Sequence, residues 1–240
     1  MLGKVKRLSL FRRIIRRQCS DRGKELSPNT LCHYTKIKNY EKIIKEDKFD
    51  LSEFCRANDY KEMYEKSNHR EELDKHRYFS LVCSRVLGTK SMCNPVMWYF
   101  YGDKHRGVCI EFDKTKLLQA EKYVREAPVM YRNGVTHYDR QQFIDYVFEK
   151  RLHWENEEEH RILYGEGVSC IKGIRTCIKN VYFGAEVPGV KVQEYREKLR
   201  QYDINVYKMR VNKTDGRLFA LKKLERIIAE KEIIIELLRK

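Results

Sequence analysis

Residues 153–163 read HWENEEEHRIL and gather four glutamates in a chain whose formal net charge is +15. The acidic run continues into HRILYG, which is expected to be a strand. Side chains of an extended backbone point to alternate faces, so Glu157, Glu159 and Arg161 are expected on one face. The stretch therefore predicts a late strand that opens with two carboxylates and a guanidinium side by side.

This acidic cluster allows two interpretations, and the residues by themselves leave both open. In the first, Arg161 is a structural ion-pair partner that fixes Glu157 or Glu159. In the second, one glutamate stabilises a positive charge that develops during a reaction, while its neighbour or the arginine orients it. The second interpretation makes Glu159 and Glu157 candidate catalytic residues.

The fold class follows from the segments around this strand. Short strands are expected at LCHYT (31–35), YFSLVC (78–83), RGVCIEFD (106–113), APVMYR (127–132), HRILYG (160–165) and IKNVYFGAEV (178–187). Helices are expected at 36–51, within 54–76 and at 139–154. Regular βα alternation is missing, and neither GxGxxG nor GxxxxGK[ST] occurs, which argues against a doubly wound or P-loop fold. We predict an α+β fold with a mainly antiparallel sheet and flanking helices.

Length and composition favour one folded domain with appendages. The chain has 240 residues, of which 42% are hydrophobic and 12% aromatic, enough for one sizeable core. We expect a basic amphipathic appendage at 1–30, a single α+β domain at 31–215 and a C-terminal helix at 216–240. No apolar run is long enough to cross a bilayer.

The cysteines indicate the compartment. Eight cysteines occur without CxxC spacing, and no cleavable signal peptide is recognisable, so reduced thiols in a cytoplasm are expected. A disulfide between Cys170 and Cys177, which would close a small loop, is left open. The sequence predicts no metal site.

The first thirty residues carry nine basic and two acidic residues. Apolar residues recur at helical spacing opposite four arginines, namely Arg12, Arg13, Arg16 and Arg17. This segment is expected to be a short amphipathic helix that packs on the domain, contacts nucleic acid, or touches a membrane surface through residues 5–17. A charge of +15 favours a polyanionic partner without choosing among these alternatives.

Two further stretches combine ring and hydroxyl groups. His33, Tyr34 and Thr35 end the first strand, and they offer one hydrogen-bonding ring, one stacking ring and one hydroxyl. A satisfied structural histidine is the alternative for His33. In NPVMWYFYG (94–102) and the residues that follow, aromatic density indicates core, but Tyr101 and His105 are placed to edge a pocket for a flat ligand.

The order of these motifs closely resembles a known family. LCHYT, an Asn-Asp pair, FSL, NPVMWYFYGDKHRGVCIEFD, APVMYR, a late W-x-x-E-x-E-x-R and VYFGAEV follow one another as in domain of unknown function 2971. The resemblance covers roughly residues 31–190. It implies a soluble bacterial protein of a kind often encoded near mobile and phage-defence genes.

A more distant resemblance links these motifs to the ADP-ribosyltransferase fold, especially its DNA-modifying toxin branch. It implies a split antiparallel sheet and NAD as substrate. His33 would bind the adenosine-side ribose, and Tyr101 or another aromatic residue of 98–101 would stack on the nicotinamide. Glu159, or else Glu157, would touch the nicotinamide ribose. The remaining residues expected around NAD are Tyr34, Thr35, Arg85 at the pyrophosphate, His105 and Arg161.

Two function classes follow from these expectations. The leading one is an ADP-ribosyltransferase-like enzyme that uses NAD, with DNA or RNA as the first candidate acceptor and protein as the second, as in a toxin or phage-defence system with a neutralising partner protein. Cleavage of the nicotinamide–ribose bond passes through an oxocarbenium-like state, which a carboxylate stabilises. The alternative is a non-enzymatic, basic nucleic-acid-binding module in which the glutamates are structural.

Overall fold

The computed structural model describes residues 29–54, 70–83, 85–86, 89–133 and 143–221. Its centre is an eight-stranded sheet of order β14-β13-β12-β6-β1-β3-β10-β7. These strands are β1 (Thr30–Thr35), β3 (Arg77–Cys83), β6 (Val108–Asp113), β7 (Arg125–Pro128), β10 (Glu159–Tyr164), β12 (Ile178–Phe183), β13 (Asn205–Val211) and β14 (Leu218–Leu221). Neighbouring strands are antiparallel except β12 and β13, which are parallel. The α+β class and the mainly antiparallel sheet are therefore confirmed.

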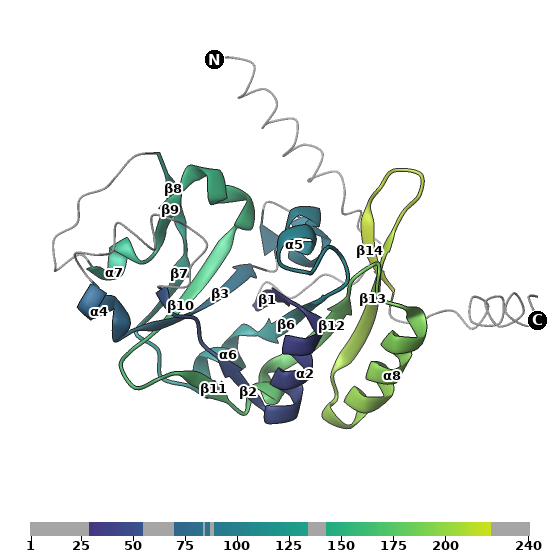
Figure 1. The fold of residues 1–240 in the computed structure, drawn as a ribbon, viewed down its shortest axis with the longest axis horizontal. Helices are drawn as coiled ribbons and strands as arrows, with labels where there is room; N and C mark the ends of the chain where they lie inside the picture. Colours follow the sequence, from purple (N-terminus) through teal and green to yellow (C-terminus); the bar gives the residue numbers. More distant parts are fainter. Residues whose placement is uncertain (1–28, 55–69, 84, 87–88, 134–142, 222–240) are drawn as a thin grey trace, which may run out of the picture.

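Helices and three small sheets surround this sheet (Figure 1). The helices are α2 (Ile37–Glu46), α4 (Arg70–Asp74), α5 (Pro95–Phe100), α6 (Lys114–Ala120), α7 (Phe143–Tyr146) and α8 (Gly189–Leu199), with 3-10 turns η3 (Ser91–Cys93), η5 (Leu152–Glu157), η6 (Ile174–Cys177) and η7 (Arg200–Tyr202). The small sheets pair β2 (Lys48–Asp50) with β11 (Cys170–Lys172), β4 (Arg85–Val86) with β5 (Thr89–Lys90), and β8 (Met130–Arg132) with β9 (Glu149–Arg151).

The two faces of the main sheet carry different layers. The α2 face, which includes Leu31, Ile110 and Ile162, packs against α2, α6, α8 and the β2–β11 pair. The opposite face, called here the α5 face, includes Cys32 and Val82 and packs against η3 and α5. Further along this face, over β3 and β10, α4 and the residues before β9 form a third apolar cluster. Strand alternation thus places successive residues in separate cores.

The main sheet forks between β1 and β3. Strand β1 pairs with β6 along six residues, and β3 pairs with β10 along six, but β1 and β3 share only two pairs, Leu31 with Cys83 and Cys32 with Val82. Beyond those pairs the two strands no longer exchange ladder hydrogen bonds. The halves β14 to β1 and β3 to β7 are therefore joined along a short seam.

Two expected helices differ from the structure. The helix expected at 36–51 ends at Glu46, because Asp47 adopts a left-handed conformation (φ 50°) and the chain turns into β2. The helix expected at 139–154 is wrong over most of its described part, since only Phe143–Tyr146 is helical before β9 and η5. Pairing of β9 with β8 overrides the helical spacing of the apolar residues there.

The last described residues belong to the main sheet. Strand β14 pairs with β13 beyond residue 215, so the first residues of the segment 216–240 form a strand. Residues 222–240, and the basic appendage with its four arginines at 1–28, lie outside the described residues. Within the described segments, no helix has the length and apolar character required to cross a membrane.

Substitution of Gly107 tests the close packing between β1 and the segment after α5. A Cβ on Gly107 would overlap the carbonyl oxygen of Thr35 and the backbone of Gly102, so Gly107→Ala is expected to lower the free energy of unfolding by about 3 kcal/mol. Gly165→Ala is the matched control, since its Cβ would meet only Val124 Cγ2 at 3.5 Å. Urea unfolding of both variants measures the difference, and equal stabilities would contradict the packing described.

Candidate functional site

The strand β10 begins with a carboxylate held by an arginine from the same face. Arg161 Nε donates to Glu159 Oε1 at 2.9 Å, and its Nη2 donates to Oε2 at 3.0 Å. The guanidinium also donates to the Val147 carbonyl and lies 4.5 Å from the centroid of the Tyr78 ring. Arg161 is fully buried, so the guanidinium has no exposed surface for the phosphates of a ligand.

Lys150 joins this pair to the second carboxylate. Its Nζ lies 2.7 Å from Glu159 Oε2 and 2.7 Å from Glu157 Oε2. The other oxygen of Glu157, Oε1, accepts a short hydrogen bond from the hydroxyl of Tyr101. Two carboxylates, one ammonium and one guanidinium therefore form a single buried ion network with no net charge.

The network explains the ionisation of Glu159. Burial by itself would raise the pKa of this carboxyl, but Arg161 and Lys150 favour the charged form and lower the pKa from 4.5 to about 2. Glu159 also has its backbone N–H bonded to the hydroxyl of Tyr131 at 2.8 Å. The carboxylate is therefore ionised at any physiological pH.

Accessibility separates the two glutamates. The side chain of Glu157 is 11% exposed and that of Glu159 only 2% exposed. Both oxygens of Glu159 are taken by Arg161, and Lys150 adds a third contact. Glu157 is therefore the carboxylate nearer to solvent, and Glu159 is the one that holds the network in place.

Helix α5 positions Tyr101. Asn94 caps the helix, since its side-chain oxygen accepts from Val96 N at 3.0 Å and Met97 N at 3.3 Å, and a proline follows at the first helical position. The same Asn94 donates through Nδ2 to the carbonyl of Asn156 in η5. The start of α5 is thus tied to the turn that carries Glu157, and Tyr101 at its end reaches back to that glutamate.

The three side chains of β1 that were expected to recognise a ligand, His33, Tyr34 and Thr35, do not converge on this network. His33 lies on the α2 face, where its ring meets Phe49 and Phe79 edge to face at 4.9 and 5.4 Å, and its Nδ1 is 3.1 Å from the Ser80 carbonyl at the fork. On the α5 face, the residue of β1 in line with Val82 and Glu159 is Cys32. The expectation that His33 and Glu159 share one pocket is therefore wrong, because strand alternation places them on opposite faces.

Tyr34 and Thr35 also have structural partners. The Tyr34 ring packs edge to face on Trp98 at 5.1 Å and is buried. Thr35 Oγ1 accepts from Asn39 Nδ2 at 3.2 Å in the first turn of α2. Alternation along β1 therefore separates the three groups that were expected to recognise one ligand together.

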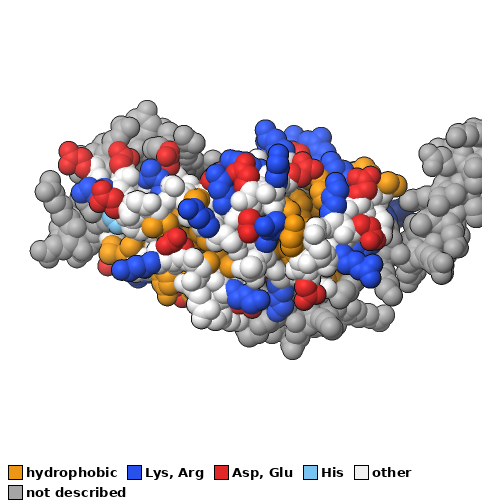
Figure 2. All heavy atoms as spheres, turned by 90° about the horizontal axis from the view of Figure 1, so that it is seen from below, with side chains coloured by type: hydrophobic (Ala, Val, Ile, Leu, Met, Phe, Trp, Pro, Cys, Tyr) orange, Lys and Arg blue, Asp and Glu red, His pale blue; other side chains and the backbone are white. Residues whose placement is uncertain are grey.

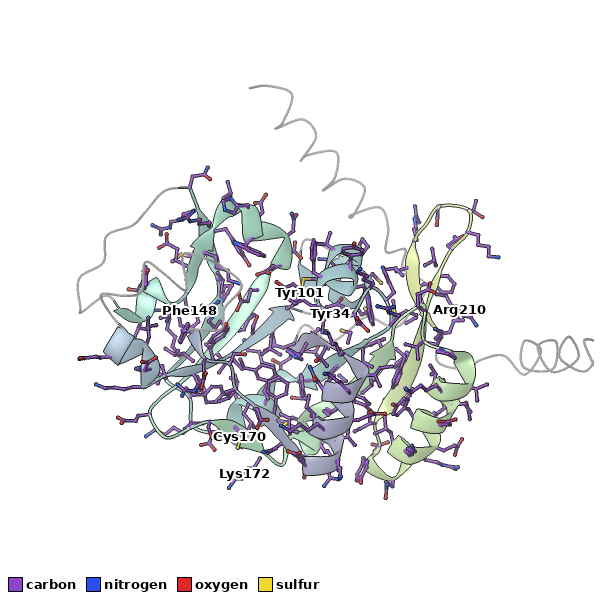
Figure 3. All side chains as sticks on the ribbon, viewed as in Figure 1. Tyr34, Tyr101, Phe148, Cys170, Lys172 and Arg210 are labelled. Carbon is purple, nitrogen blue, oxygen red and sulfur yellow. The ribbon has the colours of Figure 1, made fainter. Side chains whose placement is uncertain are left out.

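The remaining predicted ligand residues lie elsewhere. His105 is in the turn after α5 and stacks on Trp98 at 6.1 Å. Figure 3 labels Tyr34 and Tyr101, which belong to or border the same apolar cluster under α5. Arg85 begins β4, and its side chain lies outside what the structure describes, as do the four N-terminal arginines.

Lys150 and Tyr131 were missed by the sequence reasoning. Lys150 stands in a segment whose spacing indicates a helix, where a lysine is expected to be solvated. Tyr131 lies in APVMYR, which was expected as one strand but is divided between β7 and β8. The only signal for Lys150 was the surplus of glutamates at 155–159, which require a cation if they are buried.

Cysteine and metal chemistry add no further group. Cys170 and Cys177 are free, so the disulfide left open by the sequence does not form. Among the described residues, no group of three or more His, Cys, Asp or Glu side chains is arranged to hold a metal ion.

Comparisons with protein families, with curated proteins and with solved structures found no match for this chain.

The pKa of Glu159 predicts an acid-sensitive step. Its folded-state pKa lies below the unfolded value, so this carboxylate contributes stability above pH 4.5 that is lost as pH falls toward 2. We expect wild type to lose about 3 kcal/mol more over this range than Glu159→Gln does. Urea unfolding between pH 2 and about 6 measures the difference. Glu166→Gln, an exposed control, should follow wild type, and identical profiles for Glu159→Gln and wild type would contradict the network.

His33 predicts a separate pH window. Burial lowers its pKa from 6.5 to about 4, although its bond to the Ser80 carbonyl acts in the opposite direction. The unfolded chain then binds more protons between these values, so stability falls as pH decreases from 6.5 to 4, by about 3 kcal/mol. His33→Gln keeps a donor for Ser80 but removes this loss. His153→Gln, at an exposed position, should leave it unchanged; a loss that persists in His33→Gln would refute the burial of this ring.

Proposed function

We propose that this chain is an ADP-ribosyltransferase-like enzyme that uses NAD as substrate and modifies a nucleic acid. The observation that carries the proposal is the pair of glutamates formed by Glu157 in η5 and Glu159 at the start of β10. Both contact Lys150, and Glu157 also contacts Tyr101 at the end of α5. The ADP-ribosyltransferase resemblance names the same late-strand glutamates and the same aromatic block.

The strand order supports the proposal. The three segments that carry the resemblance, LCHYT, FSL and the late glutamate strand, are β1, β3 and β10, and these strands are neighbours in the sheet. The short seam of two pairs between β1 and β3 supports the comparison, because a split sheet is expected of this fold. Residues 31–35 and 159–164 are thereby brought within one strand of each other.

The chemistry assigns different roles to the two carboxylates. Glu157 is the group that stabilises the oxocarbenium-like state, because a fixed carboxylate beside the ribose interacts more strongly with the transition state than with the ground state. Lys150 and Tyr101 orient its two oxygens, one each. Glu159 with Arg161 is a positioning pair behind it. The proposal gives His33 no contact with NAD, in contrast to the role that the resemblance implies.

Release of nicotinamide from NAD by the purified full chain tests the proposal. Wild type should release nicotinamide, faster in the presence of DNA or RNA, and Glu157→Gln should lower the rate about 100-fold or more while the variant remains folded at the assay temperature. Tyr101→Phe, which removes only the hydroxyl bonded to Glu157, should lower the rate by a smaller factor.

Glu166→Gln is the matched control, since it removes an exposed carboxylate from the loop after β10 and should leave turnover unchanged. Glu159→Gln separates structure from chemistry: a positioning residue should reduce stability together with turnover. No release of nicotinamide by wild type under any condition, or full activity of Glu157→Gln, would refute the enzymatic proposal.

A nucleic-acid-binding module without enzymatic activity is the second candidate. It is favoured by the pairing inside the network, where every carboxylate oxygen has a partner, as a purely structural ion cluster requires. On the face shown in Figure 2, Lys and Arg side chains are interspersed with Asp and Glu, so that face has no patch of a single sign. The turnover experiment separates the two candidates.

A further inference from the structure

Helix α5 exposes two aromatic rings to solvent. Its sequence, PVMWYF, contains no charged residue, and Met97 and Trp98 are buried against the sheet. On the outer side, Tyr99 is 52% exposed and Phe100 is 71% exposed. Their rings meet edge to face with centroids 5.3 Å apart. Burial in the core explains why Met97 and Trp98 are apolar. It gives no reason for the aromatic rings at the exposed positions of Tyr99 and Phe100.

The turn after α5 adds positive charge beside these rings. Lys104 Nζ lies 5.8 Å from the centroid of the Tyr99 ring, and Lys104 and Arg106 are both exposed. Arg106 lies 3.5 Å from the carboxylate of Asp103 in the same turn. The two exposed rings are therefore followed directly by a turn that carries two exposed basic residues.

This turn is held in an unusual conformation. Asp103, Lys104 and His105 have φ values of 50°, 52° and 67°, three consecutive left-handed residues with side chains. Such residues are disfavoured and persist only where the surroundings determine them, often at functional sites. Backbone bonds hold the turn, from Lys104 N to Tyr99 O at 3.2 Å and from His105 N to Trp98 O at 3.2 Å. Lys104 is thereby fixed over the end of α5.

We propose that Tyr99, Phe100, Lys104 and Arg106, called here the aromatic–basic surface, bind single-stranded nucleic acid. Exposed rings provide stacking platforms for unpaired bases, while nearby lysine and arginine contact phosphates. Bases inside a duplex are already stacked and cannot use such rings, so single strands are the form that fits. A chain of +15 has the opposite sign to this partner.

The surface adjoins the carboxylate network through one residue. Phe100 ends α5 and points to solvent, whereas the next residue, Tyr101, turns inward and bonds Glu157. A nucleic-acid strand bound by Tyr99 and Phe100 would lie beside the site of the proposed chemistry. The acceptor role of the bound strand rests on the proposed function, but the binding itself does not, and it is measured without NAD.

Fluorescence anisotropy with a labelled oligothymidylate of about 15 nucleotides tests the surface with the full chain. Wild type should bind, and the double variant Tyr99→Ala/Phe100→Ala should bind at least about tenfold more weakly. Phe100→Tyr should retain affinity, since the ring remains. Lys104→Ala should reduce the slope of log affinity against log salt by about one phosphate contact.

Tyr123→Ala is the matched control, because Tyr123 is a 37% exposed tyrosine in the connection between α6 and β7. It should bind like wild type, and melting temperatures of all variants check their folding. If wild type does not bind the oligonucleotide, or if the double alanine variant binds as tightly as Tyr123→Ala does, the proposal is overturned. Equal binding of the matching duplex would also overturn it, since stacking then plays no part.

The two proposals fail separately. Loss of oligonucleotide binding in the double alanine variant with no nicotinamide release by wild type supports the surface and refutes the enzyme. Nicotinamide release that depends on Glu157, with binding unaffected by Tyr99 and Phe100, supports the enzyme and refutes the surface.

Discussion

The buried ion network around Glu159 is the constraint on which this half of the molecule depends. Removing a charged group from water costs several kcal/mol unless the group is paired and hydrogen-bonded. Here Arg161 matches one carboxylate in a bidentate pair, and Lys150 is shared with the second, Glu157. Loss of any one member would leave a buried charge without compensation, so the four groups stabilise one another as a set.

The network also determines where neighbouring elements lie. Lys150 belongs to β9, Glu157 to η5 and Glu159 to β10. The ammonium of Lys150 therefore joins β9 to both η5 and β10. Glu158 makes the link possible by adopting a left-handed conformation (φ 48°), which turns the chain between the two glutamates. Glu157 therefore approaches Glu159 through a turn and a shared lysine, and not along a continuous extended strand as its spacing suggests.

Strand positions could be predicted from the sequence where a short run of mostly apolar residues supplies both faces of a strand. This applies to β1, β3, β6, β10 and β12, whose successive side chains enter separate apolar clusters. Which face of the sheet each residue occupies could not be predicted from the sequence in the same way. LCHYT shows that Cys32 and His33 point to opposite sides, but only the register of β1 on β3 and of β3 on β10 determines which of them accompanies Glu159.

The same limit applies to Lys150 and to the helix expected at 139–154. The apolar residues of 139–154 have helical spacing. In the structure, however, Lys150 pairs with Tyr131 in the β8–β9 ladder, and these two residues are nearly twenty positions apart. Local spacing contains no information about such a pair, and tertiary contacts override propensity in so short a segment. Electrostatics therefore requires a cation beside the glutamates of 155–159, but the sequence does not identify that cation as Lys150.

Helix α5 connects the buried network with the exposed aromatic pair because it is fixed at both ends. Asn94 caps its start and bonds η5, and Trp98 anchors its middle through Nε1 to the Met92 carbonyl at 2.7 Å. At its end, a Cβ on Gly102 would overlap Trp98, so the chain can turn there only with glycine. These contacts hold the orientation of the six-residue helix about its axis. The inward direction of Tyr101 and the outward direction of Tyr99 and Phe100 therefore depend on the same contacts.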